Sequence, residues 1–200
     1  FDIEMEKQRE RARAAGNFDL DYNKLVRIEA DTEFTGYTGT AGQGKVVALL
    51  RGAEHVAELR EGEEGVVVLD RTPFYGESGG QMGDTGLITG EGFSFTVTET
   101  QKKADGLFIH SGKITKGSLK SGAPVELKVA HERRARLRSN HSATHLLHEA
   151  LREVLGTHVA QKGSLVAPDR LRFDFSHPKP ITVDELERIE ELANQIIVQN

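Results

Sequence analysis

The hydrophobic pattern is clearest in the second half of the chain, where apolar residues recur every three or four positions between Ala143 and Leu155. This period predicts an amphipathic helix, which we expect to begin near His131 and to end at Gly156. Counted at about 100° per residue, three side chains fall opposite the apolar stripe and are expected to face solvent or a cleft. They are His141, His145 and His148.

Beyond this helix the pattern changes to alternation. Residues 159–166 and 170–176 predict a hairpin around Pro168-Asp169, because apolar and charged residues alternate in the second run. A capping box at residues 182–185 then opens a second predicted helix. Its expected apolar stripe consists of Leu186, Ile189, Ala193, Ile196 and Ile197.

Residues 18–130 have a different character, with short β-rich runs between Gly-rich turns. Most of the 21 glycines lie in this stretch. Strands at this spacing predict a small barrel or sandwich. The expected strands are residues 45–51, 65–70, 93–99, 107–111 and 125–129.

The chain is therefore expected to be an α+β protein in three parts. Residues 1–17 form a connector helix, supported by Glu–Arg pairs three positions apart and by the stop signal Gly16-Asn17. Residues 18–130 form a β-barrel-like domain. Residues 131–200 form the first part of an α+β domain that the chain does not complete. The first residue is Phe1 and not Met, which also points to a segment of a longer protein.

Charge and composition narrow the range of functions. The net charge of −5 argues against general attraction to nucleic acid, and DNA is not an expected partner, yet residues 133–138 hold four arginines. This run is either a solvated helix face or a local site for an anionic ligand. The sequence has neither a secretory signal nor a stretch apolar enough to cross a membrane, so we expect a cytoplasmic protein.

His141 and His145 share one face of the predicted helix, with Cβ atoms about 5–6 Å apart. Two imidazoles at this spacing can bind one metal ion, and the alternative is a pair of exposed polar residues. Zinc takes three or four protein ligands, and the chain has no cysteine, although His158 and His177 offer further imidazoles. Ser142 stands where the metalloprotease motif has its glutamate, so the motif supplies no general base.

A second unusual segment, residues 72–86, contains five glycines in eleven residues. Glycine permits positive φ and a close approach of the backbone to a ligand. The segment is either a tight loop between strands or a loop whose N–H groups hold an anion, and it lacks the ending of a P-loop. The candidate pocket residues are Gly79, Gly80 and Gln81.

Residues 139–148, Ser-Asn-His-Ser-Ala-Thr-His-Leu-Leu-His, resemble the signature of the editing domain in the alanyl-tRNA synthetase family. The resemblance runs the whole length of the chain. Free-standing alanyl-tRNA editing proteins share the histidine and Gly-Gly-Gln motifs, but they are not expected to carry residues 5–14, which favours the synthetase. The other matching segments are residues 5–14, 34–37, 74–86, 154–166 and 171–177.

The resemblance implies an enzyme that attaches alanine to tRNA(Ala), using ATP and Mg²⁺ in a catalytic domain outside this chain. The editing domain of the family hydrolyses mischarged Ser-tRNA(Ala) and Gly-tRNA(Ala). Such a second site is needed because an alanine pocket cannot exclude glycine or strongly reject a side chain that only adds a hydroxyl. Two alternatives stay open: a free-standing alanyl-tRNA editing deacylase, and a non-catalytic tRNA-docking module.

The resemblance also implies the residues of the site. His141 and His145 are the expected Zn²⁺ ligands, with a Cys and a His expected beyond Asn200, so this segment is expected to be inactive alone. Thr144 and Gln161 are the implied catalytic residues, since the family uses a Thr before the second histidine and a Gln in the following strand. The expected contacts to tRNA phosphates are Arg133, Arg134, Arg136 and Lys162.

Overall fold

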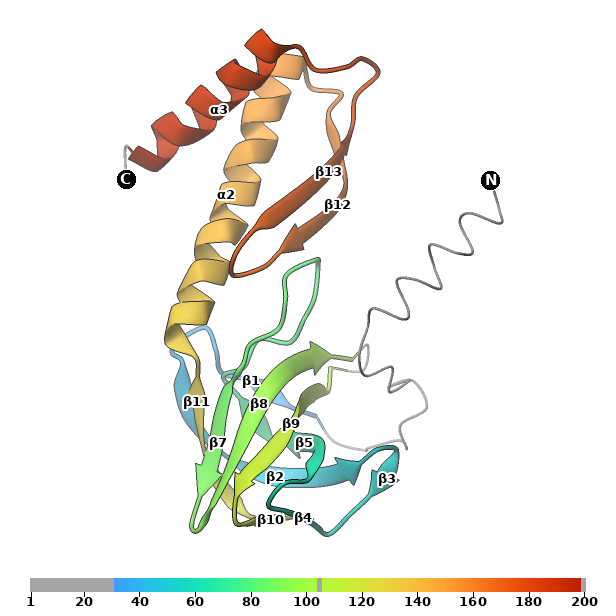
Figure 1. The fold of residues 1–200 in the computed structure, drawn as a ribbon, viewed down its shortest axis with the longest axis vertical. Coiled ribbons are helices and arrows are strands. Elements are labelled where there is room, and N and C mark those ends of the chain that lie inside the picture. The colour runs from blue at the N-terminus through green and yellow to red at the C-terminus, as the bar shows by residue number, and fades with distance from the viewer. Residues whose placement is uncertain (1–30, 104–105, 199–200) are drawn as a thin grey trace, which may run out of the picture.

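The computed structural model describes residues 31–103 and 106–198. The connector helix predicted at residues 1–17 lies outside this range. The described chain has two parts along its long axis: a strand-rich part, and a long helix that rises from it and carries a hairpin and a second helix (Figure 1). Within the described residues, no helix is long and apolar enough to span a membrane.

Six antiparallel strands close into a barrel, which confirms the prediction of a small barrel in this region. Strand β11 pairs with β7 on one side and with β2 on the other, so the sheet returns to its starting strand. In order around the barrel, the six strands are β2 (Ala41–Arg51), β5 (Glu64–Leu69), β9 (Phe108–Lys116), β8 (Phe93–Lys102), β7 (Gly86–Gly90) and β11 (Pro124–Val129). All of them except β7 overlap a predicted strand.

Short strands extend the barrel wall and its ends. Strand β3 (Glu54–His55) adds to β2, and β4 (Glu58–Arg60) pairs antiparallel with β10 (Ser118–Lys120). Strand β1 (Glu33–Phe34) pairs in parallel with β6 (Arg71–Thr72). Each has only two or three residues, which is too few for a periodic pattern to reveal.

The barrel core explains why β5 reads as an uninterrupted apolar run. Val67 and Leu69 belong to the main core cluster with Phe95, whereas Val66 and Val68 belong to a second cluster. All four β5 residues are at most 2 % exposed. A strand that is buried on both faces has no polar face, so alternation is lost.

The barrel also encloses a histidine, His110, at the end of a short polar chain. Its Nδ1 lies 3.0 Å from the carbonyl oxygen of Val67, which can only accept, so Nδ1 donates and Nε2 accepts from the Thr72 hydroxyl at 2.8 Å. Complete burial lowers the pKa of His110 to about 4, although the Val67 hydrogen bond acts in the opposite direction. His110 is therefore neutral at physiological pH.

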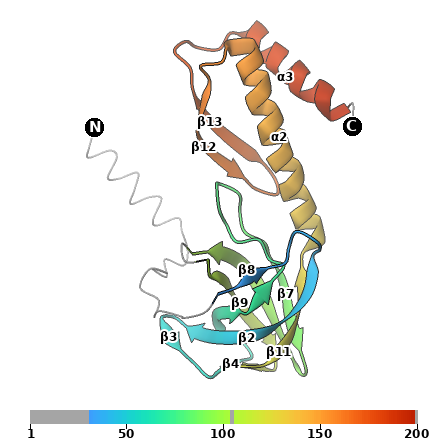
Figure 2. The same ribbon diagram turned by 180° about the vertical axis from the view of Figure 1, so that it is seen from behind.

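Helix α2 (His131–Leu155) begins two residues after β11 ends, and Gly156 follows it with a φ of 115°. The hairpin β12 (Ala160–Val166) and β13 (Leu171–Ser176) packs beside it, and helix α3 (Val183–Val198) packs across its far end (Figure 2). The predicted long helix, hairpin and second helix are thus present.

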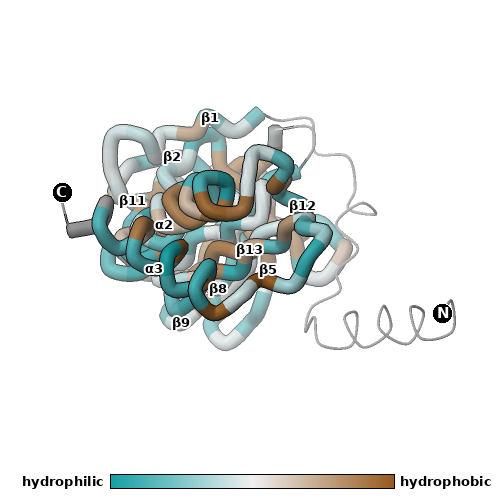
Figure 3. Tube along the Cα trace, turned by 90° about the horizontal axis from the view of Figure 1, so that it is seen from above, coloured by the Kyte–Doolittle hydropathy of each residue, from teal (hydrophilic) through white to brown (hydrophobic). Residues whose placement is uncertain are grey.

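A separate core holds these elements together. Ala150 and Leu151 of α2 pack with Val159 and with Ile189 of α3, and viewed from above the hydrophobic segments gather toward the interior (Figure 3). The predicted stripe of α3 is wrong at Leu186, which is 56 % exposed. Leu192 packs against this core together with Ala193, while the side chains of Ile196 and Ile197 lie outside the described part.

The predicted capping box is confirmed at the start of α3. The amide of Glu185 donates to the Thr182 hydroxyl at 3.3 Å, and the amide of Thr182 donates to the Glu185 carboxylate at 2.9 Å. These reciprocal bonds satisfy two N–H groups that have no helical partner. The bond from the Thr182 amide also lowers the pKa of Glu185.

Candidate functional site

The glycine-rich segment, residues 72–86, leaves the barrel after β6 and rises to the hairpin before it returns as β7 (Figure 1). It pairs with the lower end of β12. The amide of Met82 donates to the carbonyl of Val166 at 3.0 Å, and the amide of Val166 donates to the carbonyl of Gly80 at 2.8 Å. The segment therefore joins the barrel to the helical half of the chain.

Glycine is required where this segment touches the hairpin. Gly80 has a φ of 83°, and a Cβ placed there would collide with the carbonyl oxygen of Ser164. Gly79 also has a positive φ, of 59°, but a Cβ there would meet open space. The two adjacent glycines thus differ: Gly80 permits close packing, whereas Gly79 permits only the turn.

The backbone of this segment is largely satisfied by the protein itself. The amides of Ser78 and Gln81 bond to each other's carbonyls, and the amide of Glu77 bonds to Thr100. The pKa of Glu77 is raised by partial burial and by the neighbouring Glu99. These contacts favour the alternative in which the segment is a structural loop, since the amides just named are not free to hold an anion.

The side chain of Gln81 reaches the histidine pair on α2. Gln81 is only 8 % exposed, and its Oε1 lies 2.5 Å from Nδ1 of His141. Nε2 of His141 in turn lies 3.1 Å from Nε2 of His145. Both histidines are exposed. A glutamine from the barrel side and two histidines from the helix therefore form one connected group.

The geometry of the pair fits two ligands of a zinc ion. Two nitrogens bound to zinc at about 2.0–2.1 Å in tetrahedral geometry lie about 3.3 Å apart, close to the 3.1 Å between the two Nε2 atoms. Among the described residues, no group of three or more His, Cys, Asp or Glu side chains could hold a metal ion. Within this part of the chain, the His141–His145 pair has the spacing of two zinc ligands.

His158 and His177 do not join this pair. They contact each other, with Nε2 of His158 2.9 Å from Nδ1 of His177, just beyond the end of α2 that lies farthest from the barrel. His148 also differs from the prediction that it faces solvent or a cleft. It is half-buried and its ring lies 5.0 Å from that of Phe173, because the hairpin covers this side of α2.

The two residues implied as catalytic have other contacts here. Thr144 is 7 % exposed, and its hydroxyl donates to the carbonyl of Asn140 at 2.8 Å. Gln161 is exposed on β12, opposite Phe175 of β13. The adjacent Lys162 is also exposed, at an irregularity in the pairing. Neither the hydrogen bond of Thr144 nor the strand pairing of Gln161 connects these residues to His141 or His145.

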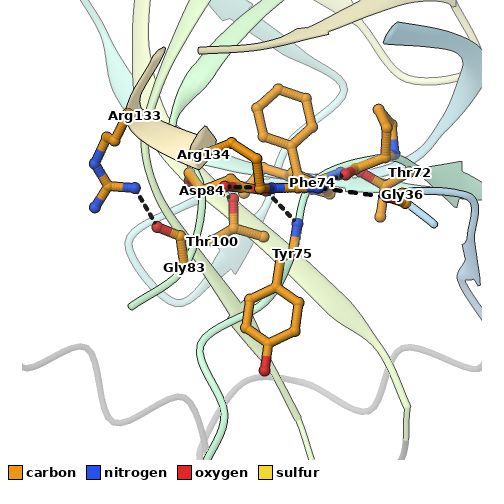
Figure 4. Close-up of polar contacts among 11 residues, drawn as sticks. Gly36, Thr72, Phe74, Tyr75, Gly83, Asp84, Thr100, Arg133 and Arg134 are labelled. Carbon is orange, nitrogen blue, oxygen red and sulfur yellow. Dashed lines mark hydrogen bonds and ion pairs between the residues drawn. The ribbon is translucent and has the colours of Figure 1, made fainter. Parts of the chain in front are cut away.

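The four predicted tRNA contacts separate into exposed and internal residues. The guanidinium of Arg134 is buried, forms an ion pair with Asp84 and donates to the carbonyl of Pro73 at 2.8 Å (Figure 4). Arg134 is therefore not placed to bind an external phosphate. Half-buried Arg133 donates to the carbonyl of Gly83 at 2.6 Å, whereas Arg136 and Lys162 are exposed.

Sequence reasoning missed two side-chain contacts between the glycine-rich segment and α2. Gln81 and His141 are 60 positions apart, and Asp84 and Arg134 are 50 apart. Asp84 is buried and also accepts a hydrogen bond from the amide of Tyr75 at 2.7 Å. A single buried aspartate in a loop produces no periodic pattern in the sequence. The available signal was weaker: a polar residue directly after two glycines.

Comparison with known proteins places the chain in a class. Residues 1–133 match the family model described as tRNA synthetases class II (A), which covers about two thirds of the chain. The chain therefore belongs to the class II tRNA synthetase family. Within it, the chain matches a segment of alanine–tRNA ligases and has the sequence of an alanyl-tRNA synthetase fragment.

Two curated relatives define this match. The alanine–tRNA ligase of Mesorhizobium japonicum is 64 % identical over 169 residues, which are 84 % of the chain and 19 % of that protein. The alanine–tRNA ligase of Chelativorans sp. is 56 % identical over an alignment of 206 residues, covering 100 % of the chain and 23 % of that protein. The chain thus spans about a fifth of the length of these relatives.

Proposed function

We propose that this chain supplies the histidine half of a zinc-dependent editing site in an alanyl-tRNA synthetase. The site removes Ser and Gly from mischarged Ser-tRNA(Ala) and Gly-tRNA(Ala), in a cytoplasmic enzyme that charges tRNA(Ala) with the help of ATP and Mg²⁺ bound elsewhere. The observation that carries the proposal is the 3.1 Å separation between Nε2 of His141 and Nε2 of His145 on an exposed helix face.

His141 and His145 would hold the metal through Nε2, and a Cys and a His beyond residue 200 would complete its ligands. When bound, zinc supplies an electrophile that polarises an ester carbonyl or a water molecule. The protein's part is to fix the two imidazoles on one rigid helix, so that the ligands need little rearrangement on binding.

Thr144 offers a physical basis for recognising a seryl group. Its hydroxyl proton is directed to the carbonyl of Asn140, so the lone pairs of its oxygen remain available as acceptors. A seryl hydroxyl can donate to that oxygen, whereas an alanyl methyl cannot. Gln161 is a further polar candidate for the same pocket. Exposed Arg136 and Lys162 are suited to the phosphates of the tRNA acceptor end, which position it without reading sequence.

The proposal is tested in the full-length enzyme with His145→Ala. We expect deacylation of Ser-tRNA(Ala) to fall about 100-fold or more, because a bound metal ion contributes several kcal/mol of transition-state stabilisation. Ser-tRNA(Ala) should then accumulate while the rate of alanine attachment is retained. His158→Ala is the matched control, because it removes an exposed histidine that lies outside the pair. Deacylation of Ser-tRNA(Ala) by His145→Ala at the wild-type rate would refute the proposal.

Two measurements separate this function from the alternatives. A non-catalytic tRNA-docking module predicts that the full-length protein binds no zinc through His141, so metal content should not change in His141→Ala. A free-standing deacylase predicts that the 200-residue chain hydrolyses Ser-tRNA(Ala) by itself. Our proposal predicts weak zinc binding and little deacylation by this chain, because its described part offers two ligands at this site where zinc takes three or four.

A further inference from the structure

We infer that Gln81 is a positioning residue for His141, so that a loop of the barrel decides which imidazole nitrogen is offered to the metal. This inference rests on the proposed zinc site. It concerns a residue that lies outside the helix bearing the two histidines and 60 positions earlier in the chain.

The contact itself determines the tautomer of His141. The Gln81 atom that faces Nδ1 is the carbonyl oxygen Oε1, at 2.5 Å, and a carbonyl oxygen can only accept. Nδ1 must therefore carry the hydrogen. Nε2 then keeps its lone pair and faces His145, whose Nε2–H can donate to it across 3.1 Å in the absence of metal. To hold zinc through Nε2 as well, His145 would carry its ring hydrogen on Nδ1 instead.

Gln81 can do this because its own position is fixed. Its amide donates to the carbonyl of Ser78 at 3.0 Å, and the residues on either side of it bond to Val166 of β12. Gly80 permits this pairing, since any side chain there would collide with Ser164. With 8 % exposure, the Gln81 side chain loses little further freedom when it binds His141.

The functional consequence is a link between the two halves of the chain. Hydrogen-bond partners of metal-bound histidines fix ring orientation, and their removal typically lowers metal affinity about 10–100-fold. Here the partner comes from the barrel and not from the helix. If the loop moves away from β12, His141 loses its partner and the pair loses its preferred tautomer.

The test uses Gln81→Leu, which removes the acceptor, and Gln81→Glu, which restores one. Gln43→Leu is the matched control, because Gln43 is an exposed barrel residue on β2. Nitrogen NMR of ¹⁵N-histidine in the metal-free 200-residue chain reports the tautomer of His141. Competition with a chelator reports the zinc affinity of the full-length protein.

We expect Nδ1 of His141 to be protonated in the wild type, Gln81→Glu and Gln43→Leu, and the tautomers to mix in Gln81→Leu. Zinc affinity should fall about 10–100-fold in Gln81→Leu alone. If the wild-type protein binds zinc, the inference is overturned when Gln81→Leu leaves either the tautomer or the zinc affinity unchanged. If the wild-type protein binds no zinc but the tautomer still depends on Gln81, the proposed function fails and the positioning role of Gln81 stands.

Discussion

Acidification should destabilise the barrel in part through one buried residue, His110. This histidine is completely buried and its pKa is lowered to about 4, mainly because burial disfavours the charged ring. In the unfolded chain its pKa returns to about 6.5. Between these values the unfolded state binds a proton that the folded state does not, so the free energy of unfolding falls as pH falls from about 6.5 to 4.

The size of the effect follows from the two pKa values. One pH unit inside this window changes the free energy of unfolding by about 1.4 kcal/mol. Acidification from pH 7.5 to pH 5 crosses about 1.5 units of the window, so His110 should cost the protein about 2 kcal/mol. Above pH 6.5 the contribution of His110 does not change with pH.

The assay compares the 200-residue chain with His110→Gln, whose amide can still bond to the Val67 carbonyl and the Thr72 hydroxyl. Denaturant unfolding followed by circular dichroism at pH 7.5 and pH 5 gives the free energy of unfolding of each protein. The other ionisable groups are common to both and cancel in the difference. We expect the wild type to lose about 2 kcal/mol more than the variant, and an equal loss in the two proteins would show that His110 is not a buried neutral imidazole.

Two further substitutions test the contacts between the halves of the chain. Arg134→Leu leaves the buried carboxylate of Asp84 unpaired and should lower the free energy of unfolding by about 3–5 kcal/mol, as measured by denaturant unfolding. The control Arg136→Leu, at an exposed position, should lower it far less. Gly80→Ala should accelerate hydrogen exchange at the Val166 amide, which bonds to the Gly80 carbonyl, because a Cβ would collide with Ser164. Gly79→Ala imposes a similar backbone strain, but its methyl meets open space, so it should accelerate that exchange less than Gly80→Ala. Equal exchange in both variants would contradict the close packing at Gly80.

Local periodic patterns account for the parts of the fold that the sequence predicts. The helix from His131 to Leu155 follows from apolar spacing over several turns, and five barrel strands follow from β-rich runs between glycines. Strand β7 escaped prediction because it has five residues, of which the two ends are glycines. Leu186 was misassigned because the side of α3 that faces α2 depends on the packing of two helices, which the pattern of one helix does not determine.

The candidate site divides in the same way. That His141 and His145 share a face follows from helix geometry alone, since they are four residues apart. By contrast, Arg134 looks like its neighbours in an arginine-rich run, and only the approach of Asp84 from the barrel makes it internal. The pattern of α2 alone predicts that His148 faces solvent or a cleft, but Phe173 of strand β13 packs against its ring.

Two contacts between the loop and α2 require the loop and the helix to cover matching distances. Gln81 bonds to His141 and Asp84 bonds to Arg134, so three positions of loop run alongside seven positions of helix. Three extended residues reach about 10–11 Å, and seven helical residues rise about 10.5 Å and turn almost twice around, which keeps Arg134 and His141 on one side of α2. Inserting or deleting one residue between either pair would break this match, by about 3.5 Å in the loop or about 100° in the helix. The number of residues from 81 to 84 and the number from 134 to 141 are therefore constrained together, and neither can change without the other.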